Sequence, residues 1–270
     1  MDKPAAVRIG NQTAFSASYV MQPFQFAAAN GFGAFEWFPD KKDSGAGWDE
    51  KDISGQTRSL INDTAVAGDI RLSVHAPWQF NPLRAGAYEY LAVTAGFAGD
   101  IGASLFNIHL YAGEGLAAFA DAIIPIVRLL EDKGIKLSIE NTPATGPEDF
   151  NELFRCLRSM DNTAHIGMCL DIGHANLFSA TRNDYLKFVD LLDSQVPVIH
   201  MHMHENFGDC DNHLPLFTGP AGKNPAGIKG LINRLKKRGL PDCIILEQWP
   251  QPPNLLIETR DRLLSMMGNQ

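Results

Sequence analysis

Short apolar runs alternate with longer segments of helical periodicity along the whole chain. The apolar runs predict eight strands, at Val7–Phe15, Ala34–Trp37, Ile70–His75, Leu105–His109, Lys136–Glu140, His165–Asp171, Val196–His202 and Cys243–Glu247. The periodic segments predict eight helices, at Pro23–Asn30, Gln56–Gly68, Arg84–Asp100, Glu114–Lys133, Pro147–Arg158, Thr181–Asp193, Ala226–Arg238 and Pro253–Met267. Because the pattern keeps one character from end to end, we expect a single domain over residues 1–270.

Eight strand-then-helix units in a chain of this size favour an α/β fold, a single (β/α)8 TIM barrel. A doubly wound open sheet is the alternative. Such a sheet usually carries a glycine-rich phosphate-binding turn after its first strand. Here Gly31-Phe32-Gly33 precedes a strand instead, so the barrel is the preferred prediction.

Composition and charge narrow the class of protein. The 270 residues are 45% hydrophobic and 20% charged, as in an ordinary globular protein. The formal net charge of −8 disfavours a nucleic-acid partner without excluding one, since a basic groove can exist within an acidic total. The four dispersed cysteines read as free thiols. No signal-peptide layout and no long apolar stretch is visible, so we expect a cytoplasmic protein.

Seven of the eight predicted strands end on a side chain that can bind a metal. These residues are spaced about 31 to 45 positions apart, roughly one strand-helix unit each. A barrel would bring them to its carboxyl-terminal rim, where barrel enzymes keep their active sites. The residues are Glu36, His75, His109, Glu140, Asp171, His202 and Glu247.

Buried carboxylates and imidazoles need neutralisation, and no matching set of lysines or arginines is visible. Divalent ions (Mn²⁺, Zn²⁺, Co²⁺ or Mg²⁺) would supply it. The alternation of His200, His202 and His204 points three imidazoles to one face of a strand. Asp171 with His174, and Asp211 with His213, add two more carboxylate–imidazole pairs.

Structural explanations remain open for several of these residues. A single histidine such as His75 or His109 at a strand end is more often a hydrogen-bonded structural residue than a ligand. Against this, seven of the eight histidines lie in these segments. Glu36 fits a ligand, a substrate contact or a structural role equally well, and packing is the commoner role for an aromatic residue such as Trp78.

Together, these segments resemble the xylose isomerase-like TIM-barrel superfamily, which contains sugar isomerases and epimerases and the endonuclease IV type of apurinic/apyrimidinic endonuclease. The resemblance runs from about Glu36 to Glu247. It is carried by Val74-His75-Ala76-Pro77, Asn107-Ile108-His109, Ile139-Glu140-Asn141-Thr142, Leu170-Asp171-Ile172-Gly173-His174, His202-Met203-His204-Glu205-Asn206, Asp211-Asn212-His213-Leu214-Pro215-Leu216 and Leu246-Glu247.

The resemblance implies a ligand set. Glu140, Asp171, His202 and Glu247 look like the four ligands of one divalent ion, with Glu140 and Glu247 also as the proton-transfer pair. The additional ligands of a trinuclear endonuclease-type site would be His75, His109, His174, Asp211 and His213. Since all nine positions are filled, the resemblance implies one to three divalent ions. As substrate contacts we predict His204, Glu36, Trp78 and His200.

Flanking residues favour the sugar branch. The endonuclease branch typically has a tyrosine shortly after its first histidine and a cysteine directly before the histidine of the Asp-x-x-His motif; this chain has Trp78-Gln79 and Gly173 there. The Pro-Leu-Gly-x-Gly ending expected after His213 is replaced by a different loop, Phe217–Gly222.

The sequence therefore predicts a metal-dependent isomerase or epimerase of a sugar or sugar phosphate, working through an enediolate. The alternative is a multinuclear phosphoesterase of the endonuclease IV type. A third possibility is a binding barrel without catalysis, which the opposed Glu140 and Glu247 disfavour. We expect a small carbohydrate as partner, no nucleic acid and no membrane, with an oligomer allowed.

Overall fold

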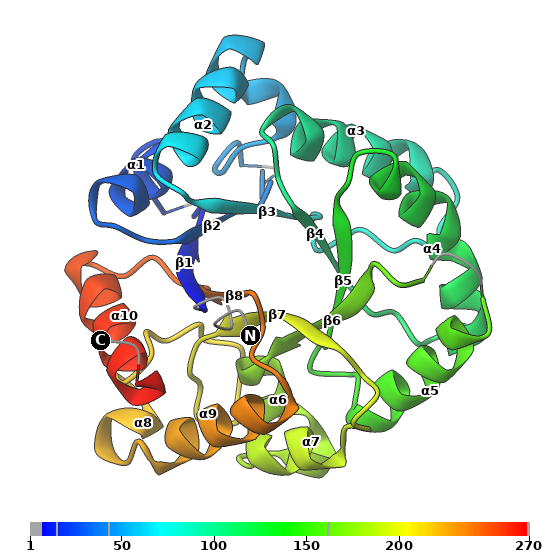
Figure 1. Ribbon diagram of the computed structural model, residues 1–270, viewed down its shortest axis with the longest axis vertical. Coiled ribbons are helices and arrows are strands. Elements are labelled where there is room, and N and C mark those ends of the chain that lie inside the picture. The colour runs from blue at the N-terminus through cyan, green and yellow to red at the C-terminus, as the bar shows by residue number, and fades with distance from the viewer. Residues whose placement is uncertain (1–6, 15, 43, 161–162, 269–270) are drawn as a thin grey trace, which may run out of the picture.

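The computed structural model describes residues 7–14, 16–42, 44–160 and 163–268. Eight parallel strands, β1 to β8, follow one another around a closed barrel, and β8 pairs back with β1. Helices surround the strands on the outside (Figure 1). The predicted (β/α)8 barrel is confirmed. The open-sheet alternative is wrong, because an open sheet would leave β1 without one of its two partners.

The strands lie close to their predicted positions. They are β1 (Arg8–Gln12), β2 (Ala34–Trp37), β3 (Arg71–His75), β4 (Leu105–His109), β5 (Lys136–Glu140), β6 (Ile166–Asp171), β7 (Val198–Met203) and β8 (Cys243–Leu246). The first strand is shorter than predicted, and its predicted last residue, Phe15, lies outside the described residues.

The helices also follow the prediction, with two short additions. They are α1 (Gln22–Ala29), α2 (Gly55–Ala67), α3 (Ala87–Asp100), α4 (Leu116–Glu131), α5 (Pro147–Arg158), α6 (Ile172–Leu177), α7 (Tyr185–Leu191), α8 (Pro220–Lys223), α9 (Ala226–Arg238) and α10 (Asn254–Met267). Single 3₁₀ turns lie at Glu50–Asp52 and Ser179–Thr181. The additions are α6 and α8, and the helix predicted from Thr181 begins only at Tyr185.

The start of α6 shows why it was missed. The Asp171 carboxylate accepts a hydrogen bond of 2.7 Å from the backbone N–H of His174, which caps the helix directly after β6. A helix of six residues is too short to display a period of 3.6. The local cap therefore forms this helix where the apolar pattern gives no signal.

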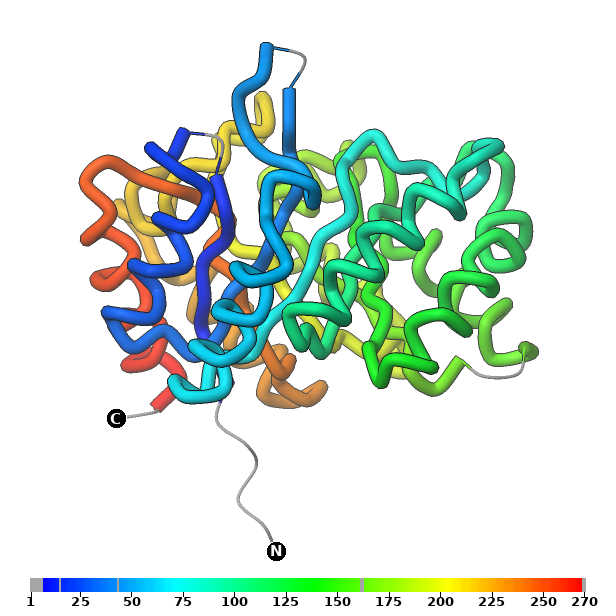
Figure 2. The backbone as a smooth tube through the Cα atoms, turned by 90° about the horizontal axis from the view of Figure 1, so that it is seen from above, coloured from blue at the N-terminus to red at the C-terminus, as the bar shows by residue number. Residues whose placement is uncertain are grey.

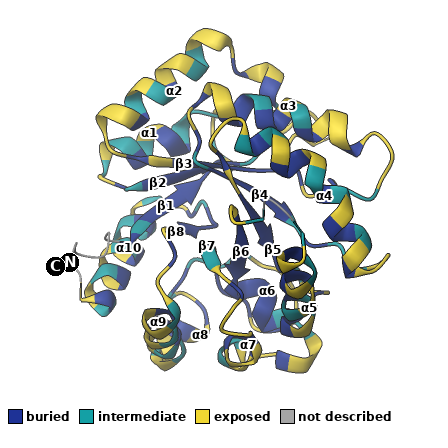
Figure 3. Cartoon of the chain, turned by 45° about the vertical axis from the view of Figure 1, so that its right-hand side comes forward, coloured by how far each residue is buried: buried dark blue, intermediate teal, exposed yellow. Residues whose placement is uncertain are grey.

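The apolar core lies between the strands and the helices. Trp37 on β2 packs with Phe24 of α1, Phe97 of α3 and Trp48, with ring centroids 5.4 to 6.1 Å apart. Figure 3 shows the same division, with the strands buried and the outward helix faces exposed.

The inside of the barrel, by contrast, is largely polar. Its small apolar cluster consists of Ala34, Cys243 and Ile245. Glu36 on β2 reaches His200 and His202 on β7, strands that do not pair, so these contacts cross the interior. TIM barrels usually fill this space with bulky branched residues. The polar filling places ionisable groups directly beneath the carboxyl-terminal rim.

The loops that follow the strands form one face of the molecule. The loop between β2 and α2 projects furthest from it, and the described chain begins on the opposite side (Figure 2). Among the described residues, no helix combines the length and apolar character that crossing a bilayer requires.

Candidate metal centre

Strand register sets the predicted ligands side by side. His109 on β4 is the register partner of Glu140 on β5, and Asp171 on β6 is the partner of His202 on β7. Alternate residues of a strand face the same side, so both partners of each pair turn towards the barrel interior. Residues spaced one strand-helix unit apart in the sequence therefore lie next to each other in the barrel.

Four predicted ligands form a buried central group. Glu140, Asp171, His202 and Glu247 each offer one ligand atom within 4.8 Å of the others. The Nδ1 atom of His202 lies 3.2 Å from Glu140 Oε2, 3.6 Å from Glu247 Oε2 and 3.9 Å from Asp171 Oδ2. None of the four is more than 5% exposed.

Two imidazoles flank this central group at Glu140. His75 Nε2 lies 3.0 Å from Glu140 Oε2, and His109 Nε2 lies 3.6 Å from Glu140 Oε1. The Glu140 carboxylate therefore stands between the central group and this histidine pair.

A third group lies on the solvent side. Asp211 Oδ2 is 3.2 Å from Nε2 of both His174 and His213. His204 belongs to the same group and stacks on His213 with ring centroids 4.0 Å apart. All nine residues predicted as ligands thus lie in three adjoining groups.

The hydrogen bonds of three histidines define which ring nitrogen faces these groups. The Nδ1 atom of His75 donates to the Ala76 carbonyl, that of His174 to the Asn141 carbonyl, and that of His213 to the Glu247 carbonyl. A carbonyl oxygen only accepts, so Nδ1 carries a proton in each ring, and Nε2 is the nitrogen that could bind a metal ion. In each ring Nε2 faces a carboxylate, which is the orientation of a metal-binding histidine.

The donor set fits a divalent cation. Three carboxylates converge in the central group, and no lysine or arginine is buried among the described residues. Glu140 Oε1, Asp171 Oδ2, Glu247 Oε2 and His202 Nδ1 are buried without a hydrogen-bonding partner in the described chain. Carboxylate oxygen and imidazole nitrogen are ligands for Zn²⁺, Mn²⁺ and related ions.

In the protein alone, the two central glutamates differ in acidity. Burial raises the pKa of Glu247 above its ordinary value despite the nearby imidazoles. Burial also acts to raise the pKa of Glu140, but the attraction of His202 and His109 outweighs it and holds the pKa well below the usual range. Such a divergence is typical of carboxyl pairs that divide acid and base roles.

The predicted substrate contacts lie at different depths. Trp78 is 54% exposed at the mouth of the site, and His204 lies within the third group. Glu36 and His200 lie deeper, 2.9 Å apart and fully enclosed. His200 precedes His202 by two residues on β7, which places it about 7 Å further from the rim. The structure thus puts Glu36 and His200 beneath the central group rather than at its mouth.

Two asparagines support the central group and were not predicted as site residues. Asn107 donates its side-chain N–H to Glu140 Oε2 and accepts a hydrogen bond of 2.6 Å from Ser138. Asn141 exchanges two hydrogen bonds of 2.9 Å with the backbone of Asp171. Asn107 lies two residues before His109, so strand alternation could have identified it.

A cavity of about 970 Å³ opens onto the histidine pair and the third group. Its floor includes His109, His174 and Asp211, and its wall includes Trp78 and Arg84. Small-molecule sites commonly have volumes of about 300 to 1,000 Å³. The cavity is therefore suited to a ligand much larger than a metal ion.

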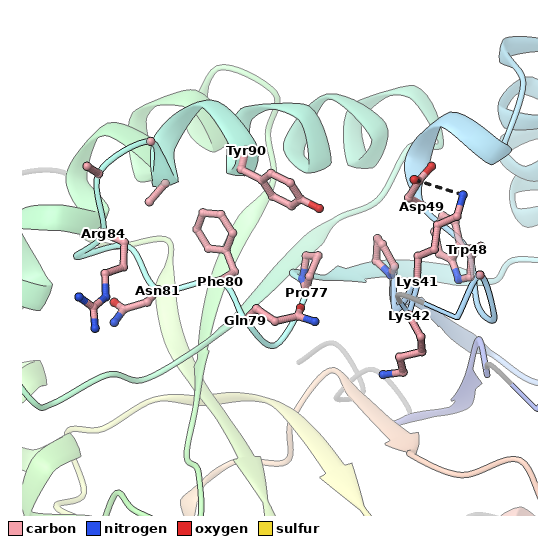
Figure 4. A pocket seen from close by; sticks show the side chains of 15 residues that line it. Lys41, Lys42, Trp48, Asp49, Pro77, Gln79, Phe80, Asn81, Arg84 and Tyr90 are labelled. Atoms are coloured by element: carbon pink, nitrogen blue, oxygen red, sulfur yellow. Dashed lines mark ion pairs between the residues drawn. The ribbon is translucent and has the colours of Figure 1, made fainter.

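A second cavity of about 660 Å³ adjoins it, between the loops that follow β2 and β3 (Figure 4). Arg84 and Asn81 line both cavities. In Figure 4 they lie across the second cavity from Lys41, which is paired with Asp49 at 3.4 Å. The two cavities thus share a wall that carries a cation.

The altered loop Phe217–Gly222 is anchored beside the site. The Glu205 carboxylate accepts backbone hydrogen bonds from Gly219 at 3.0 Å and Ala221 at 2.6 Å. Glu205 also bridges to Leu214, which follows His213 directly. The departure from the expected motif therefore leaves the Asp211–His213 segment held in place.

Comparison with known proteins identifies the family. A family model described as xylose isomerase-like TIM barrel matches residues 24–266. The chain belongs to this family. The resemblance inferred from the sequence motifs is confirmed.

The individual relatives include proteins of different function. Over 144 residues, which are 51% of the present chain, the sequence is 30% identical to MJ1311, an uncharacterized protein of Methanocaldococcus jannaschii. That match spans 45% of the relative, less than half its length.

Solved structures with the same fold include an epimerase-like protein and an endonuclease. A D-tagatose 3-epimerase-like protein superposes with a TM-score of 0.75 at 20% identity, covering 97% of this chain and 98% of the other. Endonuclease IV from Thermus thermophilus superposes with a TM-score of 0.68 at 21% identity, covering 97% and 100%. At these identities the structural likeness establishes the shared fold.

Proposed function

We propose that this xylose isomerase-like barrel is a divalent-metal-dependent isomerase or epimerase of a small carbohydrate. One observation carries the proposal. Glu140 on β5 and Glu247, which directly follows β8, approach the same atom, His202 Nδ1, within 3.2 and 3.6 Å. Two carboxylates that face one site from separated strands can remove and return a proton on one substrate.

The central group would hold the ion. Asp171 and His202 would mainly fix it, with Glu140 and Glu247 completing the set. When bound, a divalent ion would polarise the substrate carbonyl and reduce the cost of the negative charge that develops as the neighbouring carbon loses its proton. One glutamate removes that proton and the other returns it. His174 and His204 would hydrogen-bond the substrate hydroxyl groups.

The charge of the rim favours a small substrate over nucleic acid. On the described parts of the loops that follow the strands, the basic residues are Lys41, Lys42, Lys51, Arg84, Arg182 and Lys223. The acidic residues are more numerous: Asp40, Asp49, Glu50, Asp52, Glu114, Asp184, Glu205, Asp209, Asp211 and Glu247. A protein that binds the phosphate backbone of a nucleic acid needs more basic than acidic residues on the binding surface.

Proton exchange tests the proposal directly. The protein is incubated in D₂O with a panel of ketoses, sugar acids and sugar phosphates, with and without added Mn²⁺, Co²⁺ or Zn²⁺, and followed by NMR. We expect metal-dependent deuterium incorporation next to a carbonyl with at least one substrate. Absence of exchange across the panel, combined with metal-dependent cleavage of abasic-site DNA, would overturn the proposal.

A specific observation favours a second candidate, a multinuclear phosphoesterase. Eight of the nine residues belong to groups whose ligand atoms are close enough to share an ion, and the ninth, His109, lies 3.6 Å from Glu140 Oε1. A single-ion isomerase leaves the groups around His75 and around Asp211 without a metal-binding role. Metal analysis by mass spectrometry discriminates, because the second candidate requires two or more ions per chain at full activity.

A further inference from the structure

We infer that Glu36 is a positioning residue that fixes the tautomer of His202 and strengthens it as a ligand. The inference rests on the metal centre of the proposed function, but not on which reaction the centre performs.

Glu36 is surrounded by hydrogen-bond donors. Its Oε1 atom lies 2.8 Å from His202 Nε2. Its Oε2 atom lies 2.9 Å from His200 Nε2 and accepts a hydrogen bond of 2.8 Å from the Ser73 hydroxyl. The residue has no exposed surface. An ionised carboxylate only accepts, so the hydrogen bond with His200 places a proton on its Nε2. For His202 we assign the proton to Nε2 as well, because Nε2 lies 2.8 Å from Glu36 Oε1, whereas Nδ1 lies 3.2 Å from its nearest carboxylate oxygen.

This arrangement turns His202 the opposite way from the other oriented histidines. His75, His174 and His213 donate through Nδ1 to backbone carbonyls and present Nε2 to the carboxylates. His202 places Nε2 2.8 Å from Glu36 Oε1, as an ion pair, and turns Nδ1 towards Glu140 and Glu247. Among these four histidines, His202 is oriented by a side chain, and a substitution can remove that side chain.

Packing gives no reason for a carboxylate in this place. The neighbouring interior positions Ala34, Cys243 and Ile245 show that apolar residues fit inside this barrel. A buried charge has a desolvation penalty of several kcal/mol that an apolar residue avoids. A carboxylate behind a ligating imidazole, in contrast, fixes the ring and increases its basicity. Glu36 therefore acts on the metal centre through His202.

The decisive variant is Glu36→Gln, which keeps the shape and removes the charge. Affinity for Co²⁺ and Zn²⁺ is measured by competition with a chelator, and the visible spectrum of the Co²⁺ form reports ligand geometry. We expect Glu36→Gln to weaken metal binding about 10- to 100-fold and to shift the Co²⁺ spectrum. The matched control is Glu50→Gln, since Glu50 is a buried carboxylate that Thr94 binds outside the barrel. That control should leave both readouts unchanged.

A measurement on the unaltered protein protects the test against misfolding of the variant. Long-range ¹⁵N–¹H NMR of the Zn²⁺-loaded protein assigns the tautomer of each histidine. We expect His202 to carry its proton on Nε2, whereas His75, His174 and His213 carry theirs on Nδ1. A proton on Nδ1 of His202 would overturn the inference, as would a Glu36→Gln protein with unchanged affinity and spectrum. Failure of the unaltered protein to bind any divalent ion would overturn the metal centre as well. Absence of isomerase activity alone would leave the role of Glu36 standing.

Discussion

Buried carboxylates with unpartnered oxygens are the feature of single residues that defines this protein. Glu140, Asp171 and Glu247 each have such an oxygen within the central group. An unpaired buried charge is strongly destabilising, so the group is built to be completed by a cation. In the proposed function, the same residues have two roles, since those that would hold the ion would also surround the reacting carbon.

The variants Glu140→Gln and Glu247→Gln are expected to separate metal binding from proton transfer. Both should lower the rate of deuterium exchange by about 10²- to 10⁴-fold, because each removes one partner of the proton transfer. The Glu140→Gln protein should also bind less metal than the Glu247→Gln protein, since Glu140 contacts imidazoles in all three groups. Exchange rates and metal content are measured together. The control is Glu114→Gln, since the Glu114 carboxylate lines the adjoining cavity. Full exchange activity in both variants would remove them from the mechanism.

Arg84 is the residue expected to sense an acidic substituent on the substrate. Arg84 lines the cavity that also includes His109, His174 and Asp211, and a guanidinium binds phosphate or carboxylate through paired N–H donors. Arg84→Ala should raise KM for phosphorylated or acidic sugars about tenfold or more and leave KM for neutral sugars unchanged. Steady-state kinetics on matched neutral and phosphorylated substrates measure this. An equal change in KM for the neutral and the phosphorylated substrates would show that Arg84 does not bind the acidic substituent.

Sequence alone was sufficient to predict which polar residues meet at the rim, but it could not assign their depth. His200, His202 and His204 share one strand face, as the alternation predicts. Their different roles depend on partners from other strands, and Glu36 lies 164 positions from His200 in the chain. Contacts across the inside of a closed barrel leave no periodic trace in the sequence.

Among the structural elements, strands were more predictable than the short helices near the site. The strands carry buried apolar residues on their outer faces because helices cover those faces. In contrast, α6 depends on one capping carboxylate, Asp171, which is also a predicted ligand. A single residue thus links the start of a helix to the metal centre.

Gly173 in α6 illustrates that link. A methyl group added there would clash with the His204 imidazole. Gly173→Ala should therefore displace His204 and reduce metal occupancy or activity more than it lowers thermal stability. Gly96→Ala in α3 is the control, because a methyl group there meets no other atom within 4 Å, and a helical alanine adds up to about 1 kcal/mol. Thermal melts and activity of the two variants measure the difference. An active Gly173→Ala protein would show that His204 is not required.

At the scale of the whole molecule, the thiols report whether the barrel is closed. Burial raises the pKa of Cys243 to about 12 and that of Cys169 well above its ordinary value, whereas Cys210 is exposed. At pH 8, a thiol reagent should modify Cys210 rapidly and leave Cys169 and Cys243 unmodified until the protein unfolds. Mass spectrometry of the labelled peptides tests this. Rapid labelling of Cys243 in the folded protein would contradict a closed barrel.

Charge balance in the interior couples metal binding to the stability of the whole barrel. In the protein alone, burial lowers the pKa of His174, His202 and His213, but nearby carboxylates outweigh it and raise each pKa, to about 10 for His213. A group with a raised pKa stabilises the fold fully below its unfolded pKa of about 6.5, and this contribution is lost as the pH rises through the folded pKa. The metal-free protein should therefore lose stability from about pH 6.5 to 10.

A bound divalent ion supplies the positive charge that those protons otherwise provide. Protons compete with the ion for the same nitrogens, so metal affinity increases with pH, and binding to the folded state alone raises its stability. We expect the difference in Tm between the metal-loaded and the chelator-treated protein to widen from pH 6 to pH 9. Calorimetry in matched buffers measures both Tm values, and titration in buffers of different ionisation enthalpy measures the protons released. A difference in Tm that stays constant or narrows over this range would mean that these histidines do not bind the ion.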